Sequence, residues 1–264
     1  MDYVAILLAL GVLGALGAIF GVILGFAGKK FAVEVDERVT KVRECLGGAN
    51  CGACGYAGCD AFAQAVVNGE AAPNGCTPGG EKTATAIGKV LGIEVKAQGA
   101  RVAFVLCQGT NGIAKNRYDY NGIISCRAAA AMAGGPKLCL YSCLGLGDCV
   151  KKCCLNAISI HDGIASVDPN VCKGCGACAA ECPRGVIAIL PADTNVVVSC
   201  RNKDTGRKAI AVCMKACIGC KRCEKECKYE AIKVTDGFAH IDSDKCTRCG
   251  ICATVCPRGC IVTK

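Results

Sequence analysis

Residues 217–227 read Cys217-Ile-Gly-Cys220-Lys-Arg-Cys223-Glu-Lys-Glu-Cys227, and residues 246–257 read Cys246-Thr-Arg-Cys249-Gly-Ile-Cys252-Ala-Thr-Val-Cys256-Pro257. Both runs have the spacing C-x2-C-x2-C-x3-C. Four thiolates at such short separations are typical of iron–sulfur proteins, in which cysteine sulfurs hold the cluster. The two runs therefore predict that this end of the chain folds around two [4Fe–4S] clusters.

The pattern occurs twice in the chain. A shift of 74 residues aligns positions 157–185 with positions 231–259 without a gap, and 15 of these 29 positions are identical. Each copy contains an Asp-Gly pair between two short apolar stretches, which predicts a β-hairpin. This layout is that of a bacterial two-cluster ferredoxin, so the sequence predicts two such domains in tandem.

Two ligand sets are predicted for the second copy. In two-cluster ferredoxins the fourth cysteine of each run binds the other cluster. One predicted set is Cys217, Cys220, Cys223 and Cys256, and the other is Cys246, Cys249, Cys252 and Cys227.

The first copy is irregular in one run. Its regular set is predicted to be Cys172, Cys175, Cys178 and Cys153. In the other run Leu146 stands where a ligand is expected, and Cys139 is the preferred substitute, with Cys154 as the alternative. The predicted set is then Cys139, Cys143, Cys149 and Cys182. A lost site, which would leave a single-cluster module, is the other interpretation.

A fifth cluster is predicted nearer the N-terminus. Cys51-Gly-Ala-Cys54-Gly-Tyr-Ala-Gly-Cys59 is followed by Cys76, and apolar periodicity predicts helices just before this motif, at residues 60–67 and at residues 80–92. Four thiolates could instead bind zinc. The uneven spacing and the later ferredoxin-like motifs favour an iron–sulfur cluster.

Several cysteines remain outside these five sets. Ser125-Cys126-Arg127 matches Ser199-Cys200-Arg201 in the repeat, and Cys139 matches Cys213. One hypothesis is a sixth cluster; buried structural thiols are the alternative, since a free cysteine behaves as a small apolar residue. The hypothetical ligands are Cys107, Cys126, Cys200 and Cys213, whereas Cys45 and Cys260 are predicted to be spare thiols.

The charge balance argues against a nucleic-acid partner. The chain of 264 residues has 27 cysteines and a formal net charge of +9. That charge counts every thiol as neutral, whereas a cluster ligand must be a thiolate. Because thiolate-bound clusters are anionic, the basic residues are interpreted as charge compensation. Aromatic residues are not interleaved with the Lys and Arg residues as they would be in a nucleic-acid interface.

An apolar stretch predicts a single-pass membrane anchor. Tyr3–Gly28 contains no charged residue, and as a helix it would span about 39 Å, enough to cross a bilayer. Lys29 and Lys30 follow it, so the positive-inside rule predicts a body on the cytoplasmic side of the inner membrane, where cysteines stay reduced. A cleaved signal peptide is the alternative, but no basic residue precedes the stretch.

The glycines of this stretch predict contacts within the membrane. Gly17, Gly21 and Gly25 recur every four residues, which would let another transmembrane helix approach closely.

The predicted chain is therefore α+β, with a transmembrane helix, a small helical [4Fe–4S] domain and two tandem ferredoxin-like domains. The expected parts are an anchor at residues 1–30, the helical domain at 31–95, a strand-containing connection at 96–138, one ferredoxin-like domain at 139–192, a second connection at 193–212 and the other ferredoxin-like domain at 213–264.

This order of motifs resembles the B subunits of the Rnf-type ion-translocating ferredoxin:NAD oxidoreductase complexes. The most specific part of the resemblance is the Cys51–Cys76 segment together with Lys30-Phe-Ala-Val-Glu-Val35. The resemblance implies a translocase component that takes electrons from reduced ferredoxin and relays them through [4Fe–4S] clusters to membrane partner subunits, in a complex that pumps Na+ or H+.

No catalytic residue is expected in this chain itself. It shows no G-x-G-x-x-G motif after a strand, so NAD reduction is expected on other subunits. A ferredoxin-like electron donor or activator of a corrinoid or other redox enzyme is one alternative function, although a membrane anchor argues against it. A cluster-based redox sensor is the other.

Overall fold

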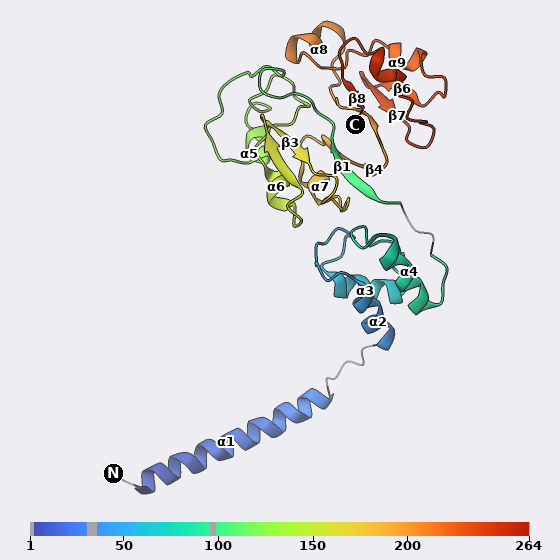
Figure 1. The fold of residues 1–264 in the computed structure, drawn as a ribbon. Helices are drawn as coiled ribbons and strands as arrows, with labels where there is room; N and C mark the ends of the chain where they lie inside the picture. The colour runs from blue at the N-terminus through green and yellow to red at the C-terminus, as the bar shows by residue number, and fades with distance from the viewer. Residues whose placement is uncertain (1–2, 31–35, 96–98, 264) are drawn as a thin grey trace.

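The computed structural model describes residues 3–30, 36–95 and 99–263 (Figure 1). Residues 31–35, which carry most of the motif that begins at Lys30, lie outside the described residues. Along the chain the structure consists of one long helix, a unit of three helices and a body that contains every strand of the described chain.

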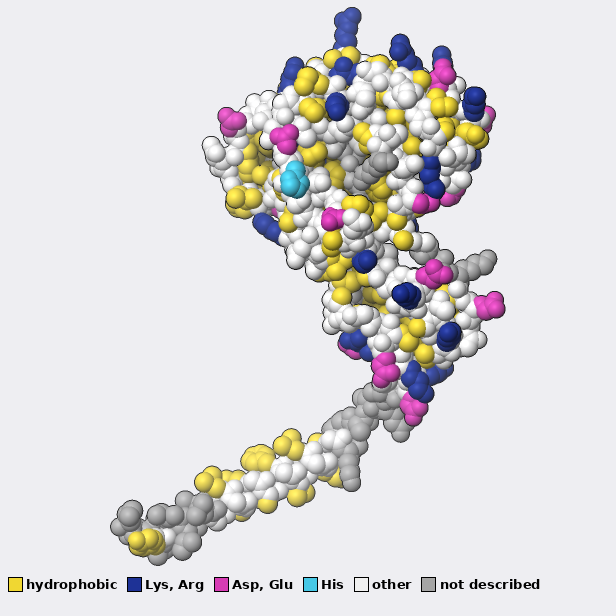
Figure 2. Space-filling model, viewed as in Figure 1, with side chains coloured by type: hydrophobic (Ala, Val, Ile, Leu, Met, Phe, Trp, Pro, Cys, Tyr) yellow, Lys and Arg dark blue, Asp and Glu magenta, His cyan; other side chains and the backbone are white. Residues whose placement is uncertain are grey.

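Helix α1 runs over Tyr3–Lys30 and extends away from the rest of the chain (Figure 1). Within the described residues it is the one helix long and apolar enough to cross a membrane, judged by length and composition. Apolar side chains lie along it (Figure 2), and Leu13, Phe20 and Phe26 are each at least 60% exposed. Exposed apolar side chains of this kind are expected on a helix whose natural surroundings are lipid or other membrane helices.

The helical unit confirms the three helices predicted around the first cysteine motif. They are α2 (Glu37–Cys45), α3 (Cys59–Val67) and α4 (Gly80–Leu91). Asp36 caps α2, because its Oδ1 accepts a hydrogen bond of 2.8 Å from the backbone N–H of Arg38. Val42, Phe62 and Ile87, one from each helix, are at most 2% exposed and form the centre of a small core.

The first module of the body spans residues 101–191. Two antiparallel strand pairs, β1 with β4 and β2 with β3, enclose short helices. Its elements in chain order are β1 (Arg101–Val105), α5 (Cys126–Ala131), α6 (Asp148–Lys152), β2 (Ile158–His161), β3 (Ile164–Val167), α7 (Ala177–Glu181) and β4 (Ile187–Pro191).

The second module spans residues 196–263 and repeats this plan. Strand β5 pairs with β8, and β6 pairs with β7, again antiparallel. Its elements are β5 (Val196–Val198), α8 (Gly206–Val212), α9 (Arg222–Lys225), β6 (Ile232–Thr235), β7 (Phe238–Ile241), α10 (Ile251–Thr254) and β8 (Ile261–Thr263).

Both predicted hairpins are confirmed. Asp162 and Gly163 join β2 to β3, and Asp236 and Gly237 join β6 to β7. All four residues have positive φ, from 46° to 88°, as a tight two-residue turn between twisted strands requires.

The connections predicted at residues 96–138 and 193–212 contribute outer strands to the modules. Strand β1 pairs with β4 along its whole length, from Arg101 opposite Pro191 to Val105 opposite Ile187. Strand β5 makes the corresponding pair with β8. Each added strand supplies backbone partners for a strand that would otherwise be an unpaired edge.

Candidate metal centres

A cysteine-lined cavity lies in the second module. It encloses about 330 Å³, and apolar side chains including Ile218, Val234 and Ile261 complete its wall. The structure brings together all four cysteines of one predicted set there: Cys217, Cys220, Cys223 and Cys256.

A second cavity of similar size, about 340 Å³, lies in the same module. Its lining contains all four cysteines of the other predicted set: Cys227, Cys246, Cys249 and Cys252. The long sequence separation between Cys227 and Cys246 is closed by the β6–β7 hairpin, which returns the chain to the same end of the module.

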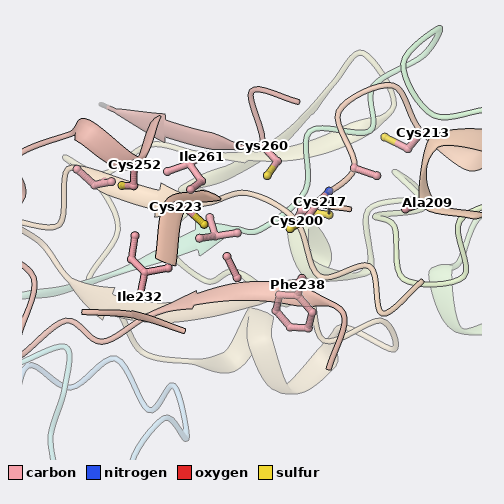
Figure 3. Close-up of a cluster of buried hydrophobic side chains, with 14 of the residues drawn as sticks. Cys200, Ala209, Cys213, Cys217, Cys223, Ile232, Phe238, Cys252, Cys260 and Ile261 are labelled. Atoms are coloured by element: carbon pink, nitrogen blue, oxygen red, sulfur yellow. Dashed lines mark hydrogen bonds between the residues drawn. The ribbon is translucent and has the colours of Figure 1, made fainter. Parts of the chain in front are cut away.

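A fifth cysteine, predicted as a spare thiol, belongs to the wall of the first cavity. Cys260 is buried among apolar side chains (Figure 3) and is 2% exposed. Its Sγ lies 3.5 Å from Cys256 Sγ. A hydrogen bond from Cys260 lowers the pKa of Cys256 to about 5 and that of Cys217 to about 6. The Cys260 thiol is itself held neutral by those two partners, since its pKa is raised. Its one proton can therefore be donated to either of the two ligand sulfurs, and the contact seen in the structure is the one with Cys256.

In the first module the regular set also converges. Burial raises the pKa of Cys178 to about 11, and the charges that raise it further are those of Cys175, Cys172 and Cys153. Strand β1 takes part in this site, because the backbone N–H of Ala103 lies 3.4 Å from Cys172 Sγ. The four predicted ligands Cys153, Cys172, Cys175 and Cys178 thus lie near one another, although Cys153 comes from a separate segment of the chain.

The irregular run gains a cysteine that the sequence did not assign to it. Burial raises the pKa of Cys149 to about 12, and the neighbouring thiols that contribute are Cys143, Cys126, Cys182 and Cys178. Cys126 begins helix α5 and is 8% exposed.

The loop before α5 is tied to the helix that carries Cys149. Asp148 Oδ2 accepts hydrogen bonds from Ser125 Oγ at 2.9 Å and from Arg127 N at 3.0 Å. These bonds hold Cys126 beside the run that lacks a ligand at Leu146. In the sequence, Cys126 stood out through the match of Ser125-Cys126-Arg127 with Ser199-Cys200-Arg201, which placed it in the hypothetical sixth set and not in this run.

Cys139, the substitute preferred in the predicted set, lines another cavity together with Cys107, Cys200 and Cys213. Burial raises its pKa to about 12, and the next contributing thiols are Cys107, Cys200 and Cys213. The alternative substitute, Cys154, is exposed. The reason is the path of the chain: the segment 107–115 of the first module packs against residues 212–215 of the second and brings Cys139 to that contact.

The first cysteine motif closes around a single region of the helical unit. Burial raises the pKa of Cys76, and Cys59, Cys51 and Cys54 are the charged neighbours that raise it further. The loop is held by Asn50, whose Oδ1 accepts a hydrogen bond of 2.8 Å from the backbone N–H of Cys59.

The donor chemistry fits iron–sulfur clusters. Thiols surround apolar hollows, and backbone N–H groups point at sulfur: those of Gly174, Ala157 and Ala165 each lie 3.4 Å from the Sγ of Cys172, Cys153 and Cys143, respectively. Such N–H groups stabilise negative charge on the sulfur of a cluster ligand. Across the described ranges no three His, Cys, Asp or Glu side chains meet closely enough to share a single metal ion.

Three family models match parts of the chain. A model described as an Fe-S cluster family covers residues 46–78, a 4Fe-4S binding domain covers residues 165–188, and a 4Fe-4S dicluster domain covers residues 216–260. These matches support [4Fe–4S] clusters as the cofactors.

Three curated proteins, each the B subunit of its complex, are similar over nearly the whole chain. That of the Na+-translocating ferredoxin:NAD+ oxidoreductase complex of Acetobacterium woodii is 45% identical, over 97% of this chain and 78% of its own length. That of the ion-translocating oxidoreductase complex of Methanosarcina acetivorans is 43% identical, over 95% of both chains. That of the proton-translocating ferredoxin:NAD+ oxidoreductase complex of Clostridium ljungdahlii is 38% identical, over 97% of this chain and 92% of its own length.

The Cys260 thiol leads to a testable prediction. Because its S–H can donate a hydrogen bond to a ligand sulfur of the first cavity, replacing it by alanine should make a cluster bound there harder to reduce. In Cys260→Ala, a redox titration followed by EPR should show one cluster with a more negative reduction potential than in the unaltered protein.

The control is Cys45→Ala, because Cys45 Sγ contacts a carbonyl of its own helix, Lys41 O at 3.2 Å. An unchanged or more positive potential in Cys260→Ala would contradict the predicted role.

Proposed function

Because the chain belongs to the B subunits of ion-translocating ferredoxin:NAD+ oxidoreductase complexes, we propose that it takes electrons from reduced ferredoxin and passes them to the membrane subunits. The chain is an electron-transfer subunit of an oxidoreductase that is also a translocase, and it works beside the other subunits of that complex. The single observation that carries the proposal is the set of cysteine-lined cavities in the body.

The bound [4Fe–4S] clusters supply one-electron redox chemistry, and the chain supplies their ligands. We assign five sets, in which Cys126 replaces Cys139 in the irregular run because the structure places Cys126 beside Cys149. The assigned sets are Cys51, Cys54, Cys59 and Cys76; Cys126, Cys143, Cys149 and Cys182; Cys153, Cys172, Cys175 and Cys178; Cys217, Cys220, Cys223 and Cys256; and Cys227, Cys246, Cys249 and Cys252.

Proximity between the sites supports a relay. Cys51 of the helical unit lies near Cys175 of the first module. Burial is the main cause that raises the pKa of Cys175, and the charge of Cys51 is one of the neighbouring charges that raise it further. The helical unit is also the part that follows α1 directly in the chain. We infer that electrons leave the body through the Cys51–Cys76 site, toward the membrane subunits.

The second module has the features of an entry point. Cys220 and Cys249 are exposed, so a donor can approach these sulfurs closely. The exposed Arg222 and Lys225 lie on α9, next to Cys223. A basic surface beside an accessible redox site favours an anionic donor and speeds its approach.

Stopped-flow reduction tests the proposed donor. Reduced ferredoxin should bleach the cluster absorbance of the anaerobic protein in a bimolecular reaction whose rate constant falls as salt is added. Reversing two charges in Arg222→Glu/Lys225→Glu should lower that rate constant about tenfold at low salt.

The matched control is Lys89→Glu, an exposed lysine on α4 in the helical unit. Equal rates in all three proteins would contradict entry at the second module. No reduction by ferredoxin in the unaltered protein would contradict the proposed function itself.

Ligand substitution tests the irregular set. If Cys126 completes it, Cys126→Ala should lose one cluster, which is about four iron atoms per chain. Cys154→Ala should keep the full iron content, because Cys154 lies beside Cys175 and is not among the thiols next to Cys149. Iron and sulfide analysis of anaerobically purified protein measures both, and the reverse result would restore Cys154 as the ligand.

The apolar helix and the family together indicate membrane association. We propose that α1 crosses the inner membrane once and that the body lies in the cytoplasm, since Lys30 ends α1 on the side of the body.

Protease treatment of oriented vesicles tests the proposed topology. Protease outside inverted vesicles should digest the body, whereas right-side-out vesicles should protect it. Protection in the inverted vesicles would place the body on the opposite side.

A further inference from the structure

We propose that Cys107, Cys139, Cys200 and Cys213 hold a sixth [4Fe–4S] cluster at the contact between the two modules. The four cysteines line one cavity, together with residues of the loops that follow β1 and β5. The sequence suggested a sixth set of Cys107, Cys126, Cys200 and Cys213. In the proposed set Cys139 takes the place of Cys126, which is assigned to the irregular run instead.

The cavity has the size of the two ferredoxin-like sites. Its hollow measures about 320 Å³, against 330 and 340 Å³ for the two hollows of the second module, each including space open to solvent. Each of the three cavities is lined by the four cysteines of one set. Space and donor count therefore match those of a [4Fe–4S] site.

Each module contributes two of the four thiols from equivalent positions. In the first module Leu106 N donates to Val186 O at 2.7 Å, and in the second Ser199 N donates to Cys260 O at 2.8 Å. The residues that follow, Cys107 and Cys200, are therefore structural counterparts.

Cys139 and Cys213 are counterparts in the same way, because each lies four residues before the first cysteine of a ferredoxin-like run. The site is thus built from two equivalent pairs of cysteines, one pair from each module.

The sulfurs receive backbone hydrogen bonds in matching pairs. The N–H groups of Gly109 and Cys143 lie 3.3 and 3.4 Å from Cys107 Sγ. Those of Asn202 and Cys217 lie 3.5 and 3.3 Å from Cys200 Sγ, and the side chains of Cys200 and Cys217 lie next to each other in Figure 3. Paired N–H donors on a sulfur favour its thiolate form, which is the form that binds iron.

A buried donor in the wall has no partner within the described chain. Asn202 is 1% exposed and lines the cavity, and its Oδ1 accepts a hydrogen bond of 2.9 Å from Asp204 N. Its Nδ2 is buried and makes no hydrogen bond. Leaving such a group unpaired is costly, and a sulfide of a cluster in the cavity is an acceptor that would satisfy it.

One buried and one half-buried cation contact residues at this site. Lys137 is 4% exposed, and its Nζ donates to the carbonyls of Gly109 at 2.6 Å and Gly163 at 3.0 Å. Among the described residues no carboxylate forms an ion pair with it. Arg258 donates to Cys213 O at 3.2 Å. Since a buried cation without a counter-charge is unfavourable, an anionic cluster in the neighbouring cavity would help to compensate the charge of Lys137.

The surrounding contact between modules is specific. Lys115 N donates to Val212 O, and Met214 N donates to Ile113 O, both at 3.0 Å. Lys215 Nζ lies 3.2 Å from Gln108 Oε1, and Gln108 Nε2 lies 3.0 Å from Gly259 O. A cluster here would tie the two modules together and place a one-electron centre between their sites.

Iron and sulfide analysis of the anaerobically purified full chain tests the sixth site. With six clusters the protein should contain about 24 iron atoms per chain, and with five about 20. The variant Cys139→Ala/Cys213→Ala removes one ligand from each module and should lower the count to about 20. The matched control Cys45→Ala/Cys154→Ala removes two cysteines assigned to no cluster and should leave the count at about 24.

A count near 20 in the unaltered protein, with no loss in the Cys139→Ala/Cys213→Ala variant, would overturn the proposal. If that variant fails to fold, the count in the unaltered protein still decides, as does the number of clusters in its Mössbauer spectrum. Neither measurement depends on ferredoxin as the electron donor, so the sixth site and the proposed function can fail separately.

Discussion

The binding of iron by buried cysteine sulfur is the interaction on which this structure depends. Fully buried large side chains are few, and most of the core of the second module consists of cysteine, alanine and β-branched residues around two hollows. Burial alone opposes thiolate formation, as the raised pKa values of Cys178, Cys223 and Cys252 show. Metal binding reverses that cost, so folding and cluster insertion are coupled.

The short helices and hairpins determine where the cysteine sulfurs lie. Short helices such as α7 and α10 each carry one ligand and begin at a glycine with positive φ, which turns the chain around the site. The two-stranded hairpins close the distance between ligands that are far apart in sequence. The buried Lys137 and the half-buried Arg258 lie near Cys213 and supply positive charge beside the predicted ligands.

The two modules are more than neighbours along the chain. Their contact is made by the loops that follow β1 and β5, and the same loops carry Cys107 and Cys200. Two similar modules that face each other through equivalent loops create a site that neither contains alone. A redox centre between them would shorten each step of a relay that runs from the exposed sulfurs of the second module to the helical unit.

The sequence by itself determined the parts that depend on local spacing. Cysteines three residues apart, such as Cys217 and Cys220, reach one site whatever the rest of the chain does, and an Asp-Gly pair needs only its own two residues to form a hairpin turn. The apolar run that forms α1 and the helices around the Cys51–Cys76 segment are equally local, since each depends on the composition or periodicity of one short segment.

Only the tertiary structure decided which site receives Cys126 and which receives Cys139. The repeat offset of 74 residues pairs Cys126 with Cys200. In the structure β1 pairs with β4 and β5 pairs with β8, and the equivalent places of β1 and β5 make Cys107 the counterpart of Cys200. The physical reason is that the order of the strands and the loops between them decide which cysteines meet. An alignment of the two repeats along the sequence does not contain that information.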